Sequence, residues 1–269
     1  MRRFFSLITV IAVQVTACSG HEFWLEPASH YISDTDVLRI KLMHGERFSG
    51  SSVPRNDAMI NRFEFVSVAD TEQVSIPVLG RDQTNTNLLR CAYSGVMVYE
   101  SDWYQSDLDA AAFEEYLAEE GLESIIAERA ERGESDLPGV ERYKRCSKSL
   151  ISVEKSSLID TWVELPLEIH ISDAIDGSQL MDQVTVTVRF EGRPIEDHRV
   201  IAVRRQAPDR LIELRTDREG QVIFVPGHND DWMVTCIHMT RSASEADADW
   251  DSYWASTTFH WSSEPKSDE

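Results

Sequence analysis

The chain has 269 residues with 47 acidic and 26 basic side chains, so its formal charge is −21 at pH 7. So acidic a protein is not expected to bind nucleic acid or anionic lipid head groups, because both attract basic faces. Four cysteines are too few for a disulfide-rich miniature scaffold, whereas the length suffices for one large or two ordinary domains.

The first 20 residues read as an export signal. Arg2 and Arg3 form a charged start, and the apolar run over residues 4–17 is shorter than a membrane-spanning helix. We therefore expect an exported protein, either in the periplasm or anchored on the extracytoplasmic side of a membrane. Two cleavages fit the sequence. A lipobox at Cys18 would leave a lipid anchor, whereas cleavage before His21 would leave an N-terminal histidine.

The next hundred residues are typical of short strands. Apolar and polar side chains alternate over residues 37–44, as they do in a half-buried strand. Similar patterns follow at residues 62–68, 74–78 and 96–99, separated by polar segments. Short strands at this spacing predict an antiparallel sandwich.

Residues 106–147 predict a small helical insertion. Ser106 has the side chain of a helix cap, and apolar residues at helical spacing follow it as far as Gly121. A second helix is expected over residues 122–132 and a further helical turn over residues 141–147. The apolar side of these helices is expected to pack against the sheet.

Strand patterns return after residue 165. Val184, Val186 and Val188 alternate with polar residues, and Asp217-Arg218-Glu219-Gly220 predicts a tight turn. Further strands are expected at residues 200–203, 211–214, 221–225, 232–239 and 253–259. Their number and spacing indicate an immunoglobulin-like or transthyretin-like sandwich.

The expected fold is therefore all-β, with two β-sandwich domains of immunoglobulin-like or transthyretin-like type and a small α-helical insertion. The first domain is predicted over residues 21–165, with the insertion at about 106–147, and the second over residues 166–262. Residues 1–20 are the predicted signal peptide, and residues 263–269 form a polar tail that we expect to be disordered.

No enzyme motif stands out in the sequence. It contains no G-x-S-x-G, no H-E-x-x-H and no glycine-rich phosphate loop, so we expect no enzymatic activity. Carboxylate pairs such as Glu119-Glu120 are too common in so acidic a chain to indicate a site. Cys91, Cys146 and Cys236 allow one disulfide and one free thiol, and the sequence does not choose the pair.

Four tryptophans lie in the last forty residues of the chain. We expect them to fill a sandwich core or to seal two domains together, with a sugar or peptide platform as the alternative. They are Trp232, Trp250, Trp254 and Trp261.

Several motifs together resemble one protein family. They run through most of the predicted mature chain: His21-Glu-Phe-Trp-Leu-Glu-Pro, Phe113-x-x-Tyr116-Leu-x-x-Glu-Glu-Gly121, Glu141-Arg-Tyr-x-Arg-Cys and Ile237-His-Met. With these motifs the chain resembles the DUF4198 family, which is similar to periplasmic components associated with nickel and cobalt uptake. The resemblance implies an exported accessory protein of β-sandwich domains, with a metal ion as ligand and no established reaction.

The resemblance extends to three histidines. His21 matches the histidine that opens the mature chain in many relatives, and His44 lies in a Met-His segment similar to that of the nickel-associated branch. His238 matches the histidine of a Val-His-Met segment. Glu100 is a departure, because relatives often carry a histidine there. His21, His44 and His238 are the predicted metal ligands.

A transition-metal site needs imidazoles, or an N-terminal amine with imidazoles, that converge on one ion. A free amine beside the imidazole of His21 would be such a chelator. Nickel, cobalt, copper and zinc are the candidate ions. The remaining histidines divide into two weaker candidates, His170 and His260, and three expected at the surface, His30, His198 and His228.

The predicted function is that of an extracytoplasmic accessory binding protein that captures or delivers a divalent transition metal for a membrane transport system. The alternative is a structural or protein-interaction module of the envelope, without metal or enzymatic chemistry. A copper enzyme built on His21 is a third hypothesis, for which the sequence names no second ligand.

Overall fold

The computed structural model describes residues 22–69, 72–154, 158, 160–172, 183–227, 229–243 and 247–262. The predicted signal peptide, His21 and the predicted tail lie outside this part of the chain. The helices and strands are β1 (Glu22–Pro27), β2 (Tyr31–Ile32), β3 (Leu38–Glu46), β4 (Ser49–Ser52), η1 (Asp57–Met59), β5 (Ile60–Ala69), β6 (Glu72–Pro77), β7 (Gly80–Arg81), β8 (Asn87–Leu89), β9 (Gly95–Ser101), β10 (Tyr104–Leu108), α1 (Ala110–Glu119), α2 (Glu123–Arg132), β11 (Gly139–Val153), β12 (Leu167–Ser172), β13 (Val184–Phe190), β14 (Arg193–Pro194), β15 (Arg199–Arg204), β16 (Ala207–Arg215), β17 (Gln221–Phe224), β18 (Asp230–Arg241) and β19 (Trp250–Trp261).

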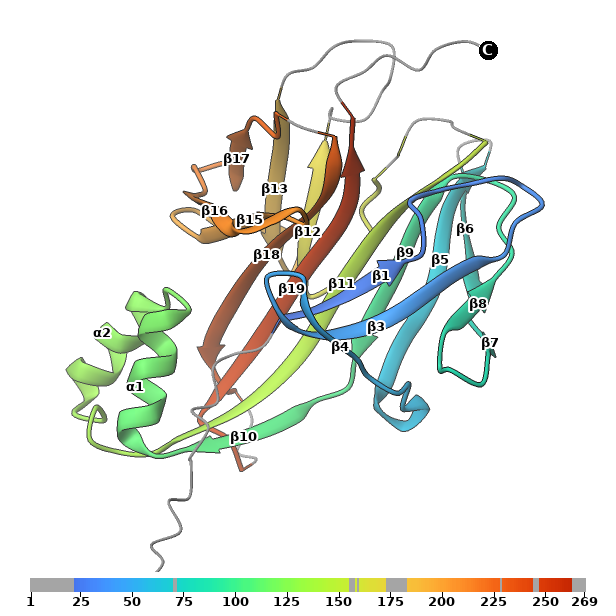
Figure 1. Ribbon diagram of the computed structural model, residues 1–269. Coiled ribbons are helices and arrows are strands. Elements are labelled where there is room, and N and C mark those ends of the chain that lie inside the picture. Colours follow the sequence, from blue (N-terminus) through green and yellow to red (C-terminus); the bar gives the residue numbers. More distant parts are fainter. Residues whose placement is uncertain are drawn as a thin grey trace, which may run out of the picture.

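A ten-stranded sheet forms the middle layer of the protein (Figure 1). Its order is β16-β15-β18-β19-β11-β9-β5-β6, and β2 and β10 also pair with β11. A five-stranded sheet contains β1, β3, β4, β7 and β8, and a four-stranded sheet contains β12, β13, β14 and β17. The predicted all-β, sandwich-type fold is confirmed.

The alternation of side chains along β9 shows how the layers stack. Val96 and Val98 enter an apolar cluster with residues of β12, β13 and β17. Met97 and Tyr99, which point to the other face of the strand, enter a cluster with residues of β1 and β3. The ten-stranded sheet therefore has an apolar core on each face, one against the four-stranded sheet and one against the five-stranded sheet.

The domain boundary predicted at residues 165 and 166 falls between β11 and β12. Strands from both sides of that boundary share one sheet, because β11 pairs in parallel with β19 over nine residue pairs, from Glu141 with Trp250 to Ser149 with Thr258. The boundary is thus not a break between separate sheets: the two sandwich cores are built on the opposite faces of one shared sheet.

The helical insertion is confirmed in α1 and α2, but its start differs from the prediction. Ser106 lies in β10, and the cap is Asp109, whose carboxylate accepts a hydrogen bond of 2.9 Å from the backbone N–H of Ala112. A carboxylate at this position satisfies a free N–H of the first turn. The second helix ends at Gly133, which has the left-handed φ of 68° that favours glycine.

The helical turn predicted over residues 141–147 is wrong, because these residues form the first half of β11. Cys146 lies opposite Glu100 of β9 on one side and opposite Ala255 of β19 on the other. Backbone pairing on both edges outweighs the helical preference of a short Glu- and Arg-containing segment.

Candidate functional site

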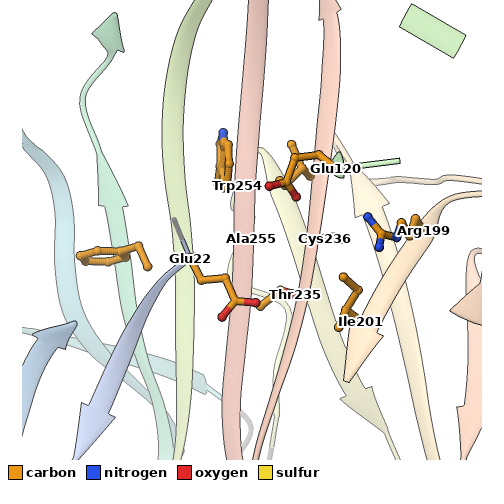
Figure 2. Close-up of a pocket in the computed structure, with 10 residues that line it drawn as sticks. Glu22, Glu120, Arg199, Ile201, Thr235, Cys236, Trp254 and Ala255 are labelled. Carbon is orange, nitrogen blue, oxygen red and sulfur yellow. The ribbon is translucent and has the colours of Figure 1, made fainter. Parts of the chain in front are cut away.

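A small pocket lies on the ten-stranded sheet at the place where β1 begins and α1 ends (Figure 2). Its cavity volume is about 40 Å³, which leaves room for roughly two or three water-sized groups. The side chains that shape it include Glu22, Phe23, Glu120, Arg199, Thr235 and Trp254. Residues from the start, the middle and the end of the chain therefore meet in this one place.

Glu22 is the first described residue, and its side chain is largely buried in the pocket. One carboxylate oxygen accepts a hydrogen bond of 2.6 Å from the backbone N–H of Arg47. Burial is the main cause that raises the pKa of this carboxyl to about 7; the Arg47 hydrogen bond lowers the pKa, and the nearby charge of Glu46 contributes a smaller rise. Glu22 consequently exchanges its proton near neutral pH.

Glu120 follows α1 directly and approaches the same space from the helix side (Figure 2). Burial raises the pKa of its carboxyl to about 7, opposed by the charge of Arg199 and reinforced by the charges of Glu22 and Glu119. The Arg199 guanidinium donates to the carbonyl oxygen of Glu119 at 2.6 Å and to Glu213 at 3.0 Å. Arg199 therefore offsets the negative charge of the pocket only in part.

A third carboxylate lies behind Glu120. Glu141 accepts hydrogen bonds from Tyr116 at 3.0 Å and from Ser252, and its charge also raises the pKa of Glu120. The Trp254 indole donates to the Ser252 hydroxyl at 3.2 Å. Glu141 is thus held by its neighbours, whereas its charge adds to the negative potential at Glu120.

The pocket combines carboxylate oxygens with a small cavity, and the pKa of both carboxyls is raised to about 7. Two buried carboxylates repel each other when both are ionised, so a cation or a proton between them lowers the energy. Carboxylate oxygens are ligands for divalent ions, including zinc. The sequence prediction did not single out Glu22 or Glu120. Their signal was positional: one directly follows His21, and the other ends the predicted helix before Gly121.

The structure places His44 near the pocket. In the pairing of β1 with β3, His44 lies opposite Phe23, which lines the pocket, and Gly45 lies opposite Glu22. Directly opposite residues of an antiparallel pair have their Cα atoms about 4.5–5.5 Å apart. His21 lies outside the described residues, but it is joined to Glu22. His44 therefore lies on the strand next to the one that His21 precedes.

His238 lies on the other face of the ten-stranded sheet. It is opposite Tyr253 in the pairing of β18 with β19, so both side chains point to the same face. The side chains on the opposite face of β19 point to β1. Ser256 and Thr258 show this, because their hydroxyls donate to the carbonyl oxygens of Phe23 and Leu25 at 2.8 and 2.9 Å. The sheet thus separates His238 from the strand pair that carries His44, and the structure does not bring these two predicted ligands together.

The other histidines have structural partners. His30, which was expected at the surface, is 4% exposed, and its Nδ1 lies 2.7 Å from the carbonyl oxygen of Leu150. His260 lies 2.8 Å from a carboxylate oxygen of Asp231, and the ring of His170 stacks on Trp162. His198 is also half-buried rather than exposed, and His228 lies outside the described residues.

The three cysteines of the described chain are buried free thiols. Cys146 and Cys236 both lie opposite Ala255, one on each side of β19, so two strand spacings of about 4.8 Å each separate them. That separation exceeds the reach of a disulfide. Burial raises the pKa of Cys146 to about 12, which keeps it a thiol.

Three of the four tryptophans lie in the core, as the sequence predicts, and the fourth does not. Trp232, Trp250 and Trp261 are buried in apolar clusters, as expected for core residues, whereas Trp254 is half-buried and lines the pocket.

Among the described residues, no three His, Cys, Asp or Glu side chains are grouped closely enough to hold a metal ion. Within the same part of the chain, neither helix has the length and apolar character needed to span a membrane.

Comparison with known proteins identifies one family. Residues 18–240 match the model of a family described as "Domain of unknown function (DUF4198)". No curated protein matches the chain. The match begins just before β1 and ends within β18, so it includes Glu22 and Glu120 of the pocket but not Trp254 of β19.

Proposed function

Because the chain belongs to the DUF4198 family, whose description gives no function, we propose a function from the geometry of the pocket. The protein is an exported accessory protein that binds a divalent transition-metal ion where β1 begins. The observation that carries this proposal is the pair of buried carboxylates, Glu22 and Glu120, with pKa values raised to about 7 in one small cavity.

The residue before Glu22 supplies the nitrogen chemistry. With export and cleavage before His21, the α-amine and imidazole of that residue would begin the mature chain next to the pocket. Amine, imidazole and carboxylate donors together suit ions such as nickel, cobalt, copper and zinc. His44, on the neighbouring strand, is the second candidate imidazole. His238 is not part of this proposed site, since it lies on the other face of the sheet.

Replacing Glu120 by glutamine is expected to weaken metal binding by about tenfold or more, which corresponds to about 1.4 kcal/mol. The amide keeps the size of the side chain but removes the negative charge that faces the ion. Calorimetric titration of the mature protein with Ni²⁺, Co²⁺, Zn²⁺ and Cu²⁺ measures the change. We expect His21→Ala to weaken the binding of the same ion.

Glu119→Gln is the matched control, because it removes the same charge from the exposed neighbour of Glu120, which acts on the pocket only through its charge and its backbone carbonyl. It should weaken ion binding clearly less than Glu120→Gln does. Equal affinities of the Glu119→Gln and Glu120→Gln proteins, or no ion bound more tightly than about micromolar, would contradict the proposed site.

The metal-free protein is expected to lose stability as the pH rises from about 4.5 to above 7. The folded-state pKa of Glu22 and Glu120 is about 7, above the ordinary 4.5, so the folded state holds more protons in this interval. Each such shift amounts to at most about 3 kcal/mol. Urea unfolding at several pH values measures this, and Glu120→Gln should flatten the slope and be the more stable protein at pH 8.

Buried histidines make the free energy of unfolding depend on pH in the opposite direction in the same experiment. Burial lowers the pKa of His30, His198 and His238 to about 4, so the stability they contribute is lost as the pH falls from about 6.5 towards 4. The difference between the Glu120→Gln and unchanged proteins removes this common contribution. A difference that stays constant between pH 5 and pH 8 would contradict the raised pKa of Glu120.

Delivery of the ion to a membrane transport component is the further part of the proposal. The second candidate function is an interaction module of the envelope. It is favoured by β6, an edge strand of the ten-stranded sheet, on which Val74 is 43% exposed, and by Leu79, which is 79% exposed just beyond it. Exposed apolar residues at a sheet edge are typical of protein contacts. This candidate takes first place if the metal titrations fail.

A further inference from the structure

Two histidines form a pair on the face of the sheet that is turned away from the pocket. His198 precedes β15, and His238 lies in β18. Their ring centroids are 5.4 Å apart, and the ring planes make an angle of 61°. The ring of Phe190 lies 4.4 Å from that of His238 and covers this side of the pair. The predicted metal ligand His238 therefore has an imidazole neighbour, but a different one from those expected.

The contacts of the His198 ring leave one of its nitrogens without a hydrogen-bond partner among the described residues. The carbonyl oxygen of Ile237 accepts a hydrogen bond from this ring. Nε2 is buried and has no hydrogen-bond partner in the part of the chain that the structure describes. A proton on Nδ1 leaves an unshared electron pair on Nε2, and metal-binding histidines commonly donate their other N–H to a backbone carbonyl in this way. Buried polar atoms without a partner are rare and require an explanation.

Burial of both rings favours their neutral form. Burial lowers the pKa of His198 to about 4, with smaller contributions from His238 and Arg215, and burial lowers the pKa of His238 to about 4. Neutral imidazole is the form that binds metal ions. The pair therefore offers two nitrogen donors that do not have to lose a proton first.

The surroundings select the class of ion. No carboxylate is among the groups that shift either pKa, and Asp197, the chain neighbour of His198, is 79% exposed and paired with Arg215. The described residues contain no group of three ligating side chains, whereas zinc sites in proteins use three or four. Two neutral nitrogen donors beside an aromatic ring suit a monovalent d¹⁰ ion, which accepts two ligands in line.

We propose that His198 and His238 form a two-imidazole site for a soft monovalent transition-metal ion, of the class of Cu(I) and Ag(I). The site lies on the face of the sheet opposite the carboxylate pocket and does not depend on the function proposed for that pocket. The rings now meet edge to face, so nitrogen-to-metal distances of about 2.0 Å on both sides require the two side chains to move apart from their centroid separation of 5.4 Å and to turn their nitrogens towards the ion.

The test uses the full mature chain labelled with ¹⁵N-histidine and titrated with Ag(I), with Cu(I) affinity measured anaerobically against a chromophoric Cu(I) chelator. One equivalent of Ag(I) should shift the imidazole nitrogen signals of His198 and His238 together. His198→Gln should lower the Cu(I) affinity by about 100-fold or more, because changes outside the ligand shell alone cost about 10–100-fold. His170→Gln, which alters a histidine stacked on Trp162, is the control and should leave the affinity unchanged.

The imidazole signals distinguish this site from the buried thiols, which also have affinity for soft ions. Glu120→Gln distinguishes it from the carboxylate pocket and should leave Ag(I) binding unaltered. If Ag(I) leaves the two histidine signals in place, or if only a divalent ion moves them, the proposal is overturned. The titration of the unchanged protein decides this even if a histidine variant fails to fold.

Discussion

Replacing Lys148 by alanine is expected to lower the free energy of unfolding by about 3–5 kcal/mol. Lys148 lies in β11, and its side chain is 1% exposed. Its ammonium group lies 2.7 Å from a carboxylate oxygen of Asp160 and 3.1 Å from one of Glu168, whose side chains are 0% and 3% exposed. Removal of the ammonium group leaves two buried carboxylates without their cation, which costs far more than the loss of an exposed ion pair.

The two carboxylates also hold the segment that connects the two cores. Glu168 accepts hydrogen bonds from the backbone N–H groups of Val163 and Leu165 at 2.8 and 3.2 Å, and Asp160 accepts one from Ile171 at 2.8 Å. Loss of Lys148 therefore weakens the hydrogen bonds that hold the connection between β11 and β12, in addition to breaking up the ion cluster. We expect faster hydrogen exchange at Val163 and Leu165 in the Lys148→Ala protein.

Urea unfolding monitored by tryptophan fluorescence measures the loss of stability. Arg218→Ala is the control, because Arg218 and Glu196 form an ion pair with side chains 85% and 62% exposed, and such pairs contribute about 0–1 kcal/mol. Lys148→Met combined with Asp160→Asn and Glu168→Gln removes all three charges, so it should be less destabilising than Lys148→Ala. A loss below about 1 kcal/mol in Lys148→Ala would contradict the assigned role.

Strands in which apolar and polar side chains alternate could be predicted from the sequence. The pattern of Val184, Val186 and Val188 predicts β13, and these residues are fully buried in the cluster beneath the four-stranded sheet. Such alternation is read easily because one face of the strand is apolar and the other is polar. The strand of residues 37–44 is confirmed in β3 for the same reason. The strand of residues 232–239 is confirmed in β18 as well, although apolar side chains lie on both of its faces.

The central strand β11 could not be predicted in this way. Ser147, Lys148, Ser149 and Ser152 are all buried, so neither side of the strand shows an apolar row. Their polar groups have partners on other segments: Lys148 meets Asp160 and Glu168, and the Ser147 hydroxyl lies 2.9 Å from that of Ser256. When the buried polar side chains of a strand find their hydrogen-bond partners far away in the sequence, the strand's own residues show no pattern that predicts it.

The candidate site was predictable only in part. The start of the predicted mature chain was recognised as a point of interest, and the structure places Glu22 in the pocket. Glu120 was not predicted, because its role depends on where α1 ends in the folded protein, at a pocket that Glu22 of β1 also lines. The pairing of His198 with His238 likewise depends on two strands that are adjacent only in the folded sheet, since β15 pairs with β18.

Replacing Trp250 by alanine is the second large effect that we expect, with a loss of about 3–5 kcal/mol in the free energy of unfolding. Trp250 is 0% exposed at the start of β19, in the cluster that joins Phe113 and Leu117 of α1 to Met239 of β18. The Arg241 guanidinium lies 4.3 Å from the ring centroid. Truncation leaves a cavity beneath the helices that the surrounding strands cannot close, because they belong to the central sheet.

The consequence extends from stability to the pocket. Since Glu120 follows α1 directly, a helix that packs less firmly on β18 and β19 holds its carboxylate less firmly in the pocket that Glu22 also lines. Trp250→Ala should therefore speed hydrogen exchange in α1 and weaken the proposed metal binding, whereas Leu137→Ala, at a residue 53% exposed, should change neither. Unchanged exchange in α1 despite a large loss of global stability would show that the helices are held by other contacts than this tryptophan.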